Sequence, residues 1–350
     1  MQVTDTSSNS DSKKILILTP FYPPNTGGAE TFCHDLVETI SEHHHIDVLT
    51  FQPFEGKAIE HPRVFCGEGS IQITRMNWGI HHKTAWEGVS IRNFFSVFPR
   101  MFFRTKSLIC ANRYDIVHAQ GLLAGLVAVL VHKRVFLTLL ALYDFPSYKW
   151  YVRKLTKFIL KRCECVFVEG ENGLKNIDSV IDNTNKVKIF NHWTDQQVFS
   201  PPLNRENDIT NVLFIGRPIK IKGMHIIKEA EKLLNNPKFR FEYVTKVKFQ
   251  DLPKYYKKAH ICVIPSIYDE GYSRVVMEAS SCGCAIIASN RGSLPEQVSN
   301  FGVVIEPTPE KFAFALNNIR RTHYQIKSYE YAKKFFSNQN AEVFLAEYKR

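Results

Sequence analysis

The sequence predicts an α/β protein of two domains, each a parallel β-sheet with helices on both faces. Short apolar runs alternate with amphipathic helical segments, and this alternation occurs twice along the chain. The length of 350 residues also corresponds to two domains of ordinary size. Apolar residues make up 44% and charged residues 23% of the chain, as in soluble globular proteins.

The first series of strands begins with KILILT (14–19), a continuous apolar run typical of a strand buried on both faces. A helix is expected from about Ala29, because apolar residues then recur at helical spacing. Further strands are predicted at 47–51, 115–119, 135–139, 165–169 and 186–190, with helical segments between most of them.

Residues 192–209 interrupt this pattern with two prolines and little apolar periodicity. A second series of strands is predicted at 211–216, 239–244, 261–265, 285–289 and 302–306, with helices such as 223–235 and 273–282. We therefore expect a disordered tail (1–13), an N-terminal domain (14–195), a linker (196–209), a C-terminal domain (210–325) and a C-terminal helical segment (326–350). Packing of that last segment on the N-terminal domain is one arrangement that this division allows.

The formal net charge of +11 implies an anionic partner, such as a nucleotide diphosphate, a nucleic acid or an acidic membrane surface. Nucleic acid fits least well, because the Lys and Arg residues are spread along the chain and no recognised motif appears. The polar N-terminus lacks the apolar core of a signal peptide, so a cytoplasmic protein is expected. The apolar stretch 121–145 is cut by three basic residues at 132–134 and predicts a helix followed by a strand.

Eight cysteines include two close pairs, Cys163/Cys165 and Cys282/Cys284. One residue separates the members of each pair, which is not the spacing of structural zinc sites. Reduced thiols in the core are expected, and metal binding is the alternative.

Glycines and cations follow the predicted strands. Gly27 and Gly28 lie between a strand and a helix, where backbone amides can approach a phosphate. GRPIKIKG (216–223) opens another helix, and its Arg217 and Lys222 would flank an anion held there. Taken singly, the glycine pair is equally explained as an ordinary turn, and Arg217 and Lys222 as two solvated surface cations.

The segment 265–287 contains two carboxylates eight residues apart, Glu270 in a loop and Glu278 within a helix that Ser273 can cap. The start of that helix offers free amides from Gly271, Tyr272, Ser273 and Arg274 for an anion. The carboxylates could accept hydrogen bonds from sugar hydroxyls. The alternative is an acidic turn followed by a helix with one exposed Glu.

Together these segments resemble family 4 glycosyltransferases, which have the GT-B fold of two Rossmann-like domains facing each other across a cleft. Glu270 to Glu278 matches the Glu-x7-Glu motif, GRPIKIKG resembles the Gly-Arg…Lys-Gly motif, and PFYPPNTGGAE (20–30) resembles the Gly-Gly-x-Glu loop. NHWTDQQVF (191–199) and GSLPEQV (292–298) resemble two further family segments. All five occur in the family's order, and the resemblance covers nearly the whole chain.

The resemblance implies a retaining transfer of a hexosyl group from a nucleotide sugar to an acceptor that is lipid-linked or a growing glycan. Arg217 and Lys222 would neutralise the leaving diphosphate, which removes the need for a metal ion or other cofactor. Glu278 would hold the ribose, Glu270 the donor sugar, and His118 would lie beside the reacting sugar. Backbone amides around Gly28 and from Gly271 through Tyr272 and Ser273 to Arg274 would contact phosphate and sugar.

Two segments depart from the family pattern. The position after 135–139 that often carries His reads Leu139-Leu140-Ala141, followed by Tyr143 and Asp144, which puts the acceptor side in doubt. TKVKFQD (245–251) lacks the family's glycine-rich turn, so uridine and guanosine donors both stay open. A GT-B nucleotide-sugar epimerase and a non-catalytic carbohydrate-binding relative are the alternative functions.

Residues 89–111 form a basic segment with an aromatic apolar face, and Pro99 predicts its division into two helices. KWYVRKLTKFILKR (149–162) adds six cations. The two segments predict peripheral contact with an anionic membrane at its inner face. In the alternative interpretation the phenylalanines pack on the N-terminal sheet.

Overall fold

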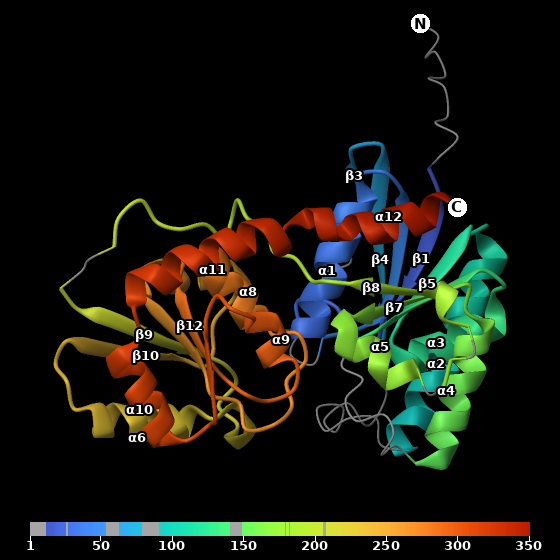
Figure 1. The fold of residues 1–350 in the computed structure, drawn as a ribbon. Helices are drawn as coiled ribbons and strands as arrows, with labels where there is room; N and C mark the ends of the chain where they lie inside the picture. Colours follow the sequence, from blue (N-terminus) through green and yellow to red (C-terminus); the bar gives the residue numbers. More distant parts are fainter. Residues whose placement is uncertain are drawn as a thin grey trace, which may run out of the picture. The chain divides into compact units, whose positions relative to one another are not determined.

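The computed structural model describes residues 12–25, 27–53, 63–78, 91–140, 149–178, 180–181, 183–205 and 208–350. Most of the predicted tail, together with Tyr143 and Asp144, lies outside these ranges. The chain forms two compact units. Unit 1 comprises Met1–Phe190 and Ala341–Arg350, and unit 2 comprises Asn191–Asn340 (Figure 1).

Unit 1 contains an eight-stranded sheet with the order β3-β4-β2-β1-β5-β6-β7-β8. Neighbouring strands are parallel, except that β3 runs antiparallel to β4. The predicted apolar runs became β1 (Lys14–Leu18), β2 (His45–Phe51), β5 (Ile116–Gln120), β6 (Val135–Leu139), β7 (Cys165–Glu169) and β8 (Val187–Phe190). Two strands at one end of the sheet, β3 (Val64–Cys66) and β4 (Gly69–Met76), were not predicted, because their exposed residues hide the apolar pattern.

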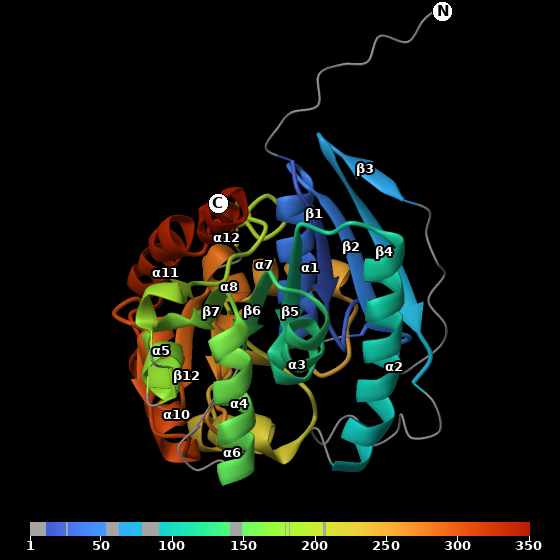
Figure 2. The same ribbon diagram turned by 90° about the vertical axis from the view of Figure 1, so that its right-hand side faces the viewer.

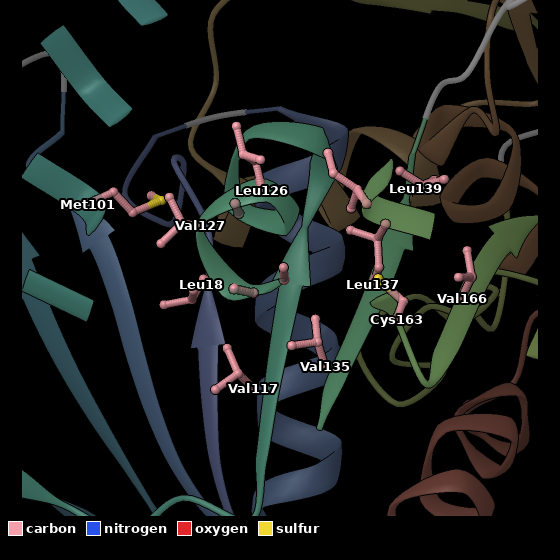
Figure 3. Close-up of a cluster of buried hydrophobic side chains, with 14 of the residues drawn as sticks. Leu18, Met101, Val117, Leu126, Val127, Val135, Leu137, Leu139, Cys163 and Val166 are labelled. Atoms are coloured by element: carbon pink, nitrogen blue, oxygen red, sulfur yellow. The ribbon is translucent and has the colours of Figure 1, made fainter. Parts of the chain in front are cut away.

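Helices α2 (Ile91–Ala111), α3 (Gly121–Val131) and α4 (Trp150–Arg162) cover one face of this sheet (Figure 2). Their apolar residues interlock with strand residues such as Val117, Leu137 and Val166 in a continuous core (Figure 3). α5 (Gly170–Asp178) packs against β7 and β8. The expected break at Pro99 is wrong, because α2 continues through it as one helix. Val97 and Met101, on either side of Pro99, are buried in this core and hold the helix against the sheet.

The opposite face of the sheet packs against α1 (Gly28–Ser41) and the last helix, α12 (Glu342–Lys349). Phe344 of α12 stacks on Phe167 of β7 with 4.2 Å between ring centroids, and it also contacts Phe32 of α1. Tyr348 stacks on Phe136 of β6. The chain therefore returns to unit 1 after completing unit 2.

Unit 2 contains a five-stranded parallel sheet with the order β10-β9-β11-β12-β13. Its strands are β9 (Thr210–Ile215), β10 (Phe239–Val244), β11 (Ile261–Ile264), β12 (Ala285–Ser289) and β13 (Val303–Ile305). One hydrophobic cluster joins the sheet to α6 (Met224–Leu234) and α10 (Pro309–Asn318). A second cluster joins it to α7 (Leu252–Lys258), α8 (Arg274–Ser281), α9 (Leu294–Val298) and α11 (Arg321–Phe335).

The segment before β9 is held on unit 2 by specific hydrogen bonds. The Thr194 amide donates to the Phe336 carbonyl at 3.0 Å, and the Gln196 side chain donates to the Ala332 carbonyl at 2.9 Å. The Arg205 guanidinium donates to the carbonyls of Lys257, Cys282 and Gly283. These bonds fix residues 194–205 against α7, α8 and α11.

Candidate functional site

Three loops of unit 2 follow the carboxyl ends of the adjacent parallel strands β9, β11 and β12, and therefore meet at one edge of the sheet. Gly223, at φ +73°, ends the first loop, and a Cβ atom there would lie 1.9 Å from the Pro265 carbonyl oxygen of the second. Gly292, at φ +57° in the third loop, would clash in the same way with Glu270. The Ile267 amide also donates to the Ile221 carbonyl at 2.9 Å. Glycine thus allows the three loops to lie in direct contact.

A network of charged and hydroxyl groups occupies this edge. Lys222 Nζ lies 2.5 Å from Glu270 Oε1 and donates to the Tyr268 hydroxyl at 2.7 Å. The Glu270 carboxylate also accepts bonds from Ser266 at 2.5 Å and from Tyr268 at 2.7 Å. Two residues from the predicted set, 48 positions apart, are therefore paired directly. Ser266 and Tyr268 were not predicted as site residues, although both lie in the segment 265–287 that contains the two carboxylates.

Burial raises the pKa of the Tyr268 hydroxyl, and the Glu270 carboxylate raises it further. The Arg217 charge opposes this shift, which places Arg217 within electrostatic range of the network. Its side chain is exposed at the first turn of the loop after β9. Tyr268 consequently stays protonated near neutral pH and acts as a hydrogen-bond donor to Glu270.

Glu278 lies in α8, almost fully buried, and both its carboxylate oxygens are engaged. Oε2 accepts a hydrogen bond from Tyr256 at 2.9 Å, and Oε1 lies 3.1 Å from Arg274 Nε. A buried carboxylate requires such partners, since an unpaired buried charge is strongly unfavourable. The buried Tyr256 of α7 was not identified from sequence, because nothing in LPKYYKK distinguishes it from an ordinary core tyrosine.

The expected row of free amides at the start of α8 needs correction at Ser273. Its amide donates to Gln297 Oε1 at 2.8 Å, and the Gln297 side chain donates back to the Ser273 carbonyl at 2.9 Å. The Ser273 side chain makes no capping bond. The buried Gln297 of α9 occupies the Ser273 amide, so the proposed amide contacts in this segment are those of Gly271, Tyr272 and Arg274.

Tyr272 is held by an aromatic contact. Its ring stacks on His192 with 5.3 Å between centroids and an interplanar angle of 13°. It also meets Phe336 edge-on at 6.2 Å. This packing orders the loop that carries Gly271 and Tyr272.

In unit 1, Gly28 opens α1 at the carboxyl end of β1. A Cβ atom at Gly28 would meet nothing within 4 Å, whereas one at Gly27 would lie 2.2 Å from Glu30 Oε2. The two glycines therefore differ: a Cβ atom at Gly27 would displace the flexible end of the Glu30 side chain, whereas Gly28 leaves open space at the first turn of the helix.

The structure places His118 in the middle of β5, since Ala119 and Gln120 continue the pairing with β6. Its ring is fully buried and hydrogen-bonds to Thr138 at 2.7 Å and to Tyr348 of α12. Burial lowers its pKa to about 3. These contacts give His118 a role in packing α12 onto the sheet.

Gln120, two residues further along, is a residue that the sequence analysis missed. Its side chain is buried at the carboxyl end of β5, and neither its amide nitrogen nor its amide oxygen has a hydrogen-bond partner among the residues that the structure describes. Unpaired buried amides cost about 1–3 kcal/mol and are uncommon in folded proteins. A polar residue ending an otherwise apolar strand was the available sequence signal.

Neither a metal-binding cluster nor a membrane-spanning helix is found among the residues that the structure describes. Within those ranges, no group of three or more His, Cys, Asp or Glu side chains could hold a metal ion. In the same part of the chain, no helix combines the length and apolar character needed to span a bilayer.

Comparison with known proteins agrees with this architecture. Residues 26–187 match the family model described as "Glycosyltransferase Family 4", and residues 203–335 match "Glycosyl transferases group 1". The O-antigen chain mannosyltransferase B of Escherichia coli is 43% identical over 65 residues, which are 19% of this chain and 17% of the mannosyltransferase.

Solved structures resemble the chain over nearly its full length. The sucrose-phosphate synthase of Thermosynechococcus elongatus aligns with a TM-score of 0.75 and 18% identity, covering 96% of this chain and 98% of the synthase. Anabaena Alr3699/HepE, crystallised with UDP-glucose, aligns with a TM-score of 0.68 and 14% identity, again covering 96% and 98%. With matching family models over both halves and this common architecture, the chain belongs to the family 4 glycosyltransferases and has the GT-B fold.

Proposed function

We propose that the protein is a retaining glycosyltransferase that moves a hexosyl group from a nucleoside-diphosphate sugar to an acceptor. The observation that carries the proposal is the Lys222–Tyr268–Glu270 network beside Arg217, where the loops after β9 and β11 meet. It combines cations for a diphosphate with a carboxylate for sugar hydroxyls. The UDP-glucose complex of the similarly folded Anabaena protein supports a donor of this class.

Arg217 and Lys222 neutralise the diphosphate as the glycosidic bond breaks. The Lys222 ammonium has three N–H donors, and Tyr268 and Glu270 occupy two of them. The third is left for a phosphate oxygen. Because positive charge fixed in place stabilises a developing anion, the proposed reaction requires neither a metal ion nor another cofactor.

Glu270 binds the donor sugar and does not act as a nucleophile in this proposal. Its carboxylate already accepts hydrogen bonds from Lys222, Ser266 and Tyr268, which stabilise the anion and weaken it as a nucleophile. Of the about four lone pairs of a carboxylate, these three bonds leave one that can accept from a sugar hydroxyl. The oxocarbenium-like transition state is then stabilised by charge without a covalent intermediate on this residue.

Glu278 holds the ribose of the donor. Tyr256 and Arg274 each donate a hydrogen bond to its carboxylate, and a carboxylate offers about four lone pairs in all. In this proposal, adjacent ribose hydroxyls donate to the same carboxylate. Arg274 and Tyr256 keep the carboxylate in the orientation that this bidentate contact needs.

Backbone amides at Gly28, Gly271, Tyr272 and Arg274 complete the proposed contacts to phosphate and sugar. Gln120 is an additional candidate, because one hydroxyl group can donate to its amide oxygen and another can accept from its amide nitrogen. Substrate binding would thereby satisfy two buried groups that lack partners in the structure.

The proposed acceptor is a lipid-linked sugar or a growing glycan, met in the cytoplasm or at the inner face of the membrane. Incubation with a panel of labelled nucleotide sugars tests the reaction directly. Transfer to an acceptor, or slow donor hydrolysis with the nucleoside diphosphate as coproduct, supports a transferase. Isomerised nucleotide sugar would show an epimerase, and failure to bind any donor would show a non-catalytic carbohydrate-binding protein.

A further inference from the structure

Helices α2 and α4 expose large aromatic side chains to solvent. Phe95 and Phe103 of α2 are 71% and 68% exposed, and Trp150 of α4 is 69% exposed. Tyr151 of α4 is also exposed. Single exposed apolar residues are normal, but groups of them mark a surface that binds something.

These residues belong to one layer of the fold. α3 contacts both α2 and α4, and the three helices lie together on one face of the eight-stranded sheet (Figure 2). The predicted apolar face of 89–111 is therefore divided, because Val97, Phe98, Met101 and Phe102 belong to or pack on the core, whereas Phe95 faces solvent. Phe103, Trp150 and Tyr151 were not predicted for that face and also face solvent. We name these four, Phe95, Phe103, Trp150 and Tyr151, the aromatic face.

The helices that carry the aromatic face have cations and no acidic residues. The sequences of α2, α3 and α4 contain no Asp or Glu. Lys154 lies 5.0 Å from the Trp150 ring centroid, and Lys149 lies 6.0 Å from that of Tyr151. The exposed cations of α2, α4 and the residue before α4 are Arg100, Arg104, Lys106, Lys149, Lys154, Lys161 and Arg162.

We propose that the aromatic face and its cations dock the protein on an anionic lipid surface. Aromatic side chains partition into the boundary between headgroups and acyl chains, and each Lys or Arg near anionic lipid adds about fivefold in affinity. Charge complementarity favours this occupant, because the surface offers an acidic partner many cations and no repelling carboxylate on these helices. The contact is a property of unit 1 and does not depend on the proposed donor chemistry.

Sedimentation of the full chain with lipid vesicles, without nucleotide sugar, tests the proposal. Wild type should sediment with vesicles containing phosphatidylglycerol, and should not sediment with phosphatidylcholine alone. Binding should weaken as salt rises, because the attraction of cations to the lipid surface is screened. Failure of wild type to bind the anionic vesicles at low salt would overturn the proposal.

Phe103→Ser combined with Trp150→Ser should reduce vesicle binding by more than about tenfold, because two apolar anchors are lost. Phe314→Ser on α10 of unit 2 is the matched control, since Phe314 is also 68% exposed, and its binding should equal that of wild type. Arg104→Glu with Lys154→Glu should also reduce binding and flatten its salt dependence. Thermal unfolding confirms that each variant is folded.

The alternatives to lipid docking predict different outcomes of the vesicle experiment. Equal binding of wild type and the double serine variant would contradict the aromatic face as a lipid anchor. If Phe314→Ser reduced vesicle binding as much as the double serine variant does, the binding would be nonspecific adhesion. Binding to soluble polyphosphate that survives the serine substitutions, with no vesicle binding, would identify a polyanion site instead.

Discussion

Substituting Glu278 by Gln tests the proposed ribose contact while changing the shape of the side chain very little. In the structure the carboxylate accepts from Tyr256 at 2.9 Å and from Arg274 at 3.1 Å. The amide of Gln can keep both bonds if its oxygen faces Arg274 and its nitrogen donates to the Tyr256 hydroxyl, which can also accept. The fold should therefore survive the substitution.

Donor binding should weaken, because the neutral amide loses the charge and the lone pairs that the ribose hydroxyls require. A hydrogen bond to a charged group contributes about 1.5–3 kcal/mol, so Glu278→Gln should weaken donor binding by about ten- to a hundredfold. Calorimetric titration with the cognate nucleotide sugar, and with the nucleoside diphosphate alone, measures this change. Both ligands should be affected alike, since both contain the ribose.

Tyr256→Phe is the matched control for this experiment. It removes one bond to Glu278 but keeps the negative charge, and it should destabilise the fold by about 1–3 kcal/mol. Its donor affinity should fall much less than that of Glu278→Gln. Near-native donor affinity in Glu278→Gln would refute the ribose role, and equal losses in both variants would show that Glu278 acts only through the packing of α7 on α8.

Three further predictions concern the remaining groups. Arg217→Ala and Lys222→Ala should each lower kcat more than donor affinity, because diphosphate charge grows as the bond breaks, and activity should survive EDTA; loss on chelation that magnesium restores would contradict this. Gln120→Leu should stabilise the fold in urea unfolding, since it removes two unpaired buried polar atoms, and should raise KM; a KM equal to wild type would exclude contact with substrate. Burial lowers the pKa of His118 from 6.5 to about 3, so below pH 6.5 the unfolded chain binds a proton that the folded chain does not. As the pH is lowered below about 6.5, this residue should reduce the free energy of unfolding by up to about 1.4 kcal/mol per pH unit. His118→Gln should remove this contribution to the pH dependence of stability between pH 7 and 4.

Some features of the fold could be read from local pattern, and others could not. The predicted run 165–169 and the observed β7 coincide, as do 285–289 and β12, because strands buried on both faces are continuous apolar runs. β4 was missed because only part of it is buried. The helix break predicted at Pro99 is absent, because packing on the sheet holds α2 on both sides of the proline. The preference of proline for helix ends describes the helix without such packing.

The sequence by itself determined the class of protein. Motif spacing and strand order identified the family, and the carboxyl ends of the strands located Arg217, Lys222, Glu270 and Glu278. These are local properties, since each depends on one strand and the loop that follows it. Composition and charge added an anionic partner but could not choose among the candidates.

The tertiary structure decided which partners hold those residues. It paired Lys222 with Glu270, assigned the Ser273 amide to Gln297, and gave Glu278 its partner Tyr256. It also placed His118 in the core under Tyr348, which is 230 residues away in sequence. Each of these contacts joins segments that the chain brings together only by folding, so no local pattern could predict them.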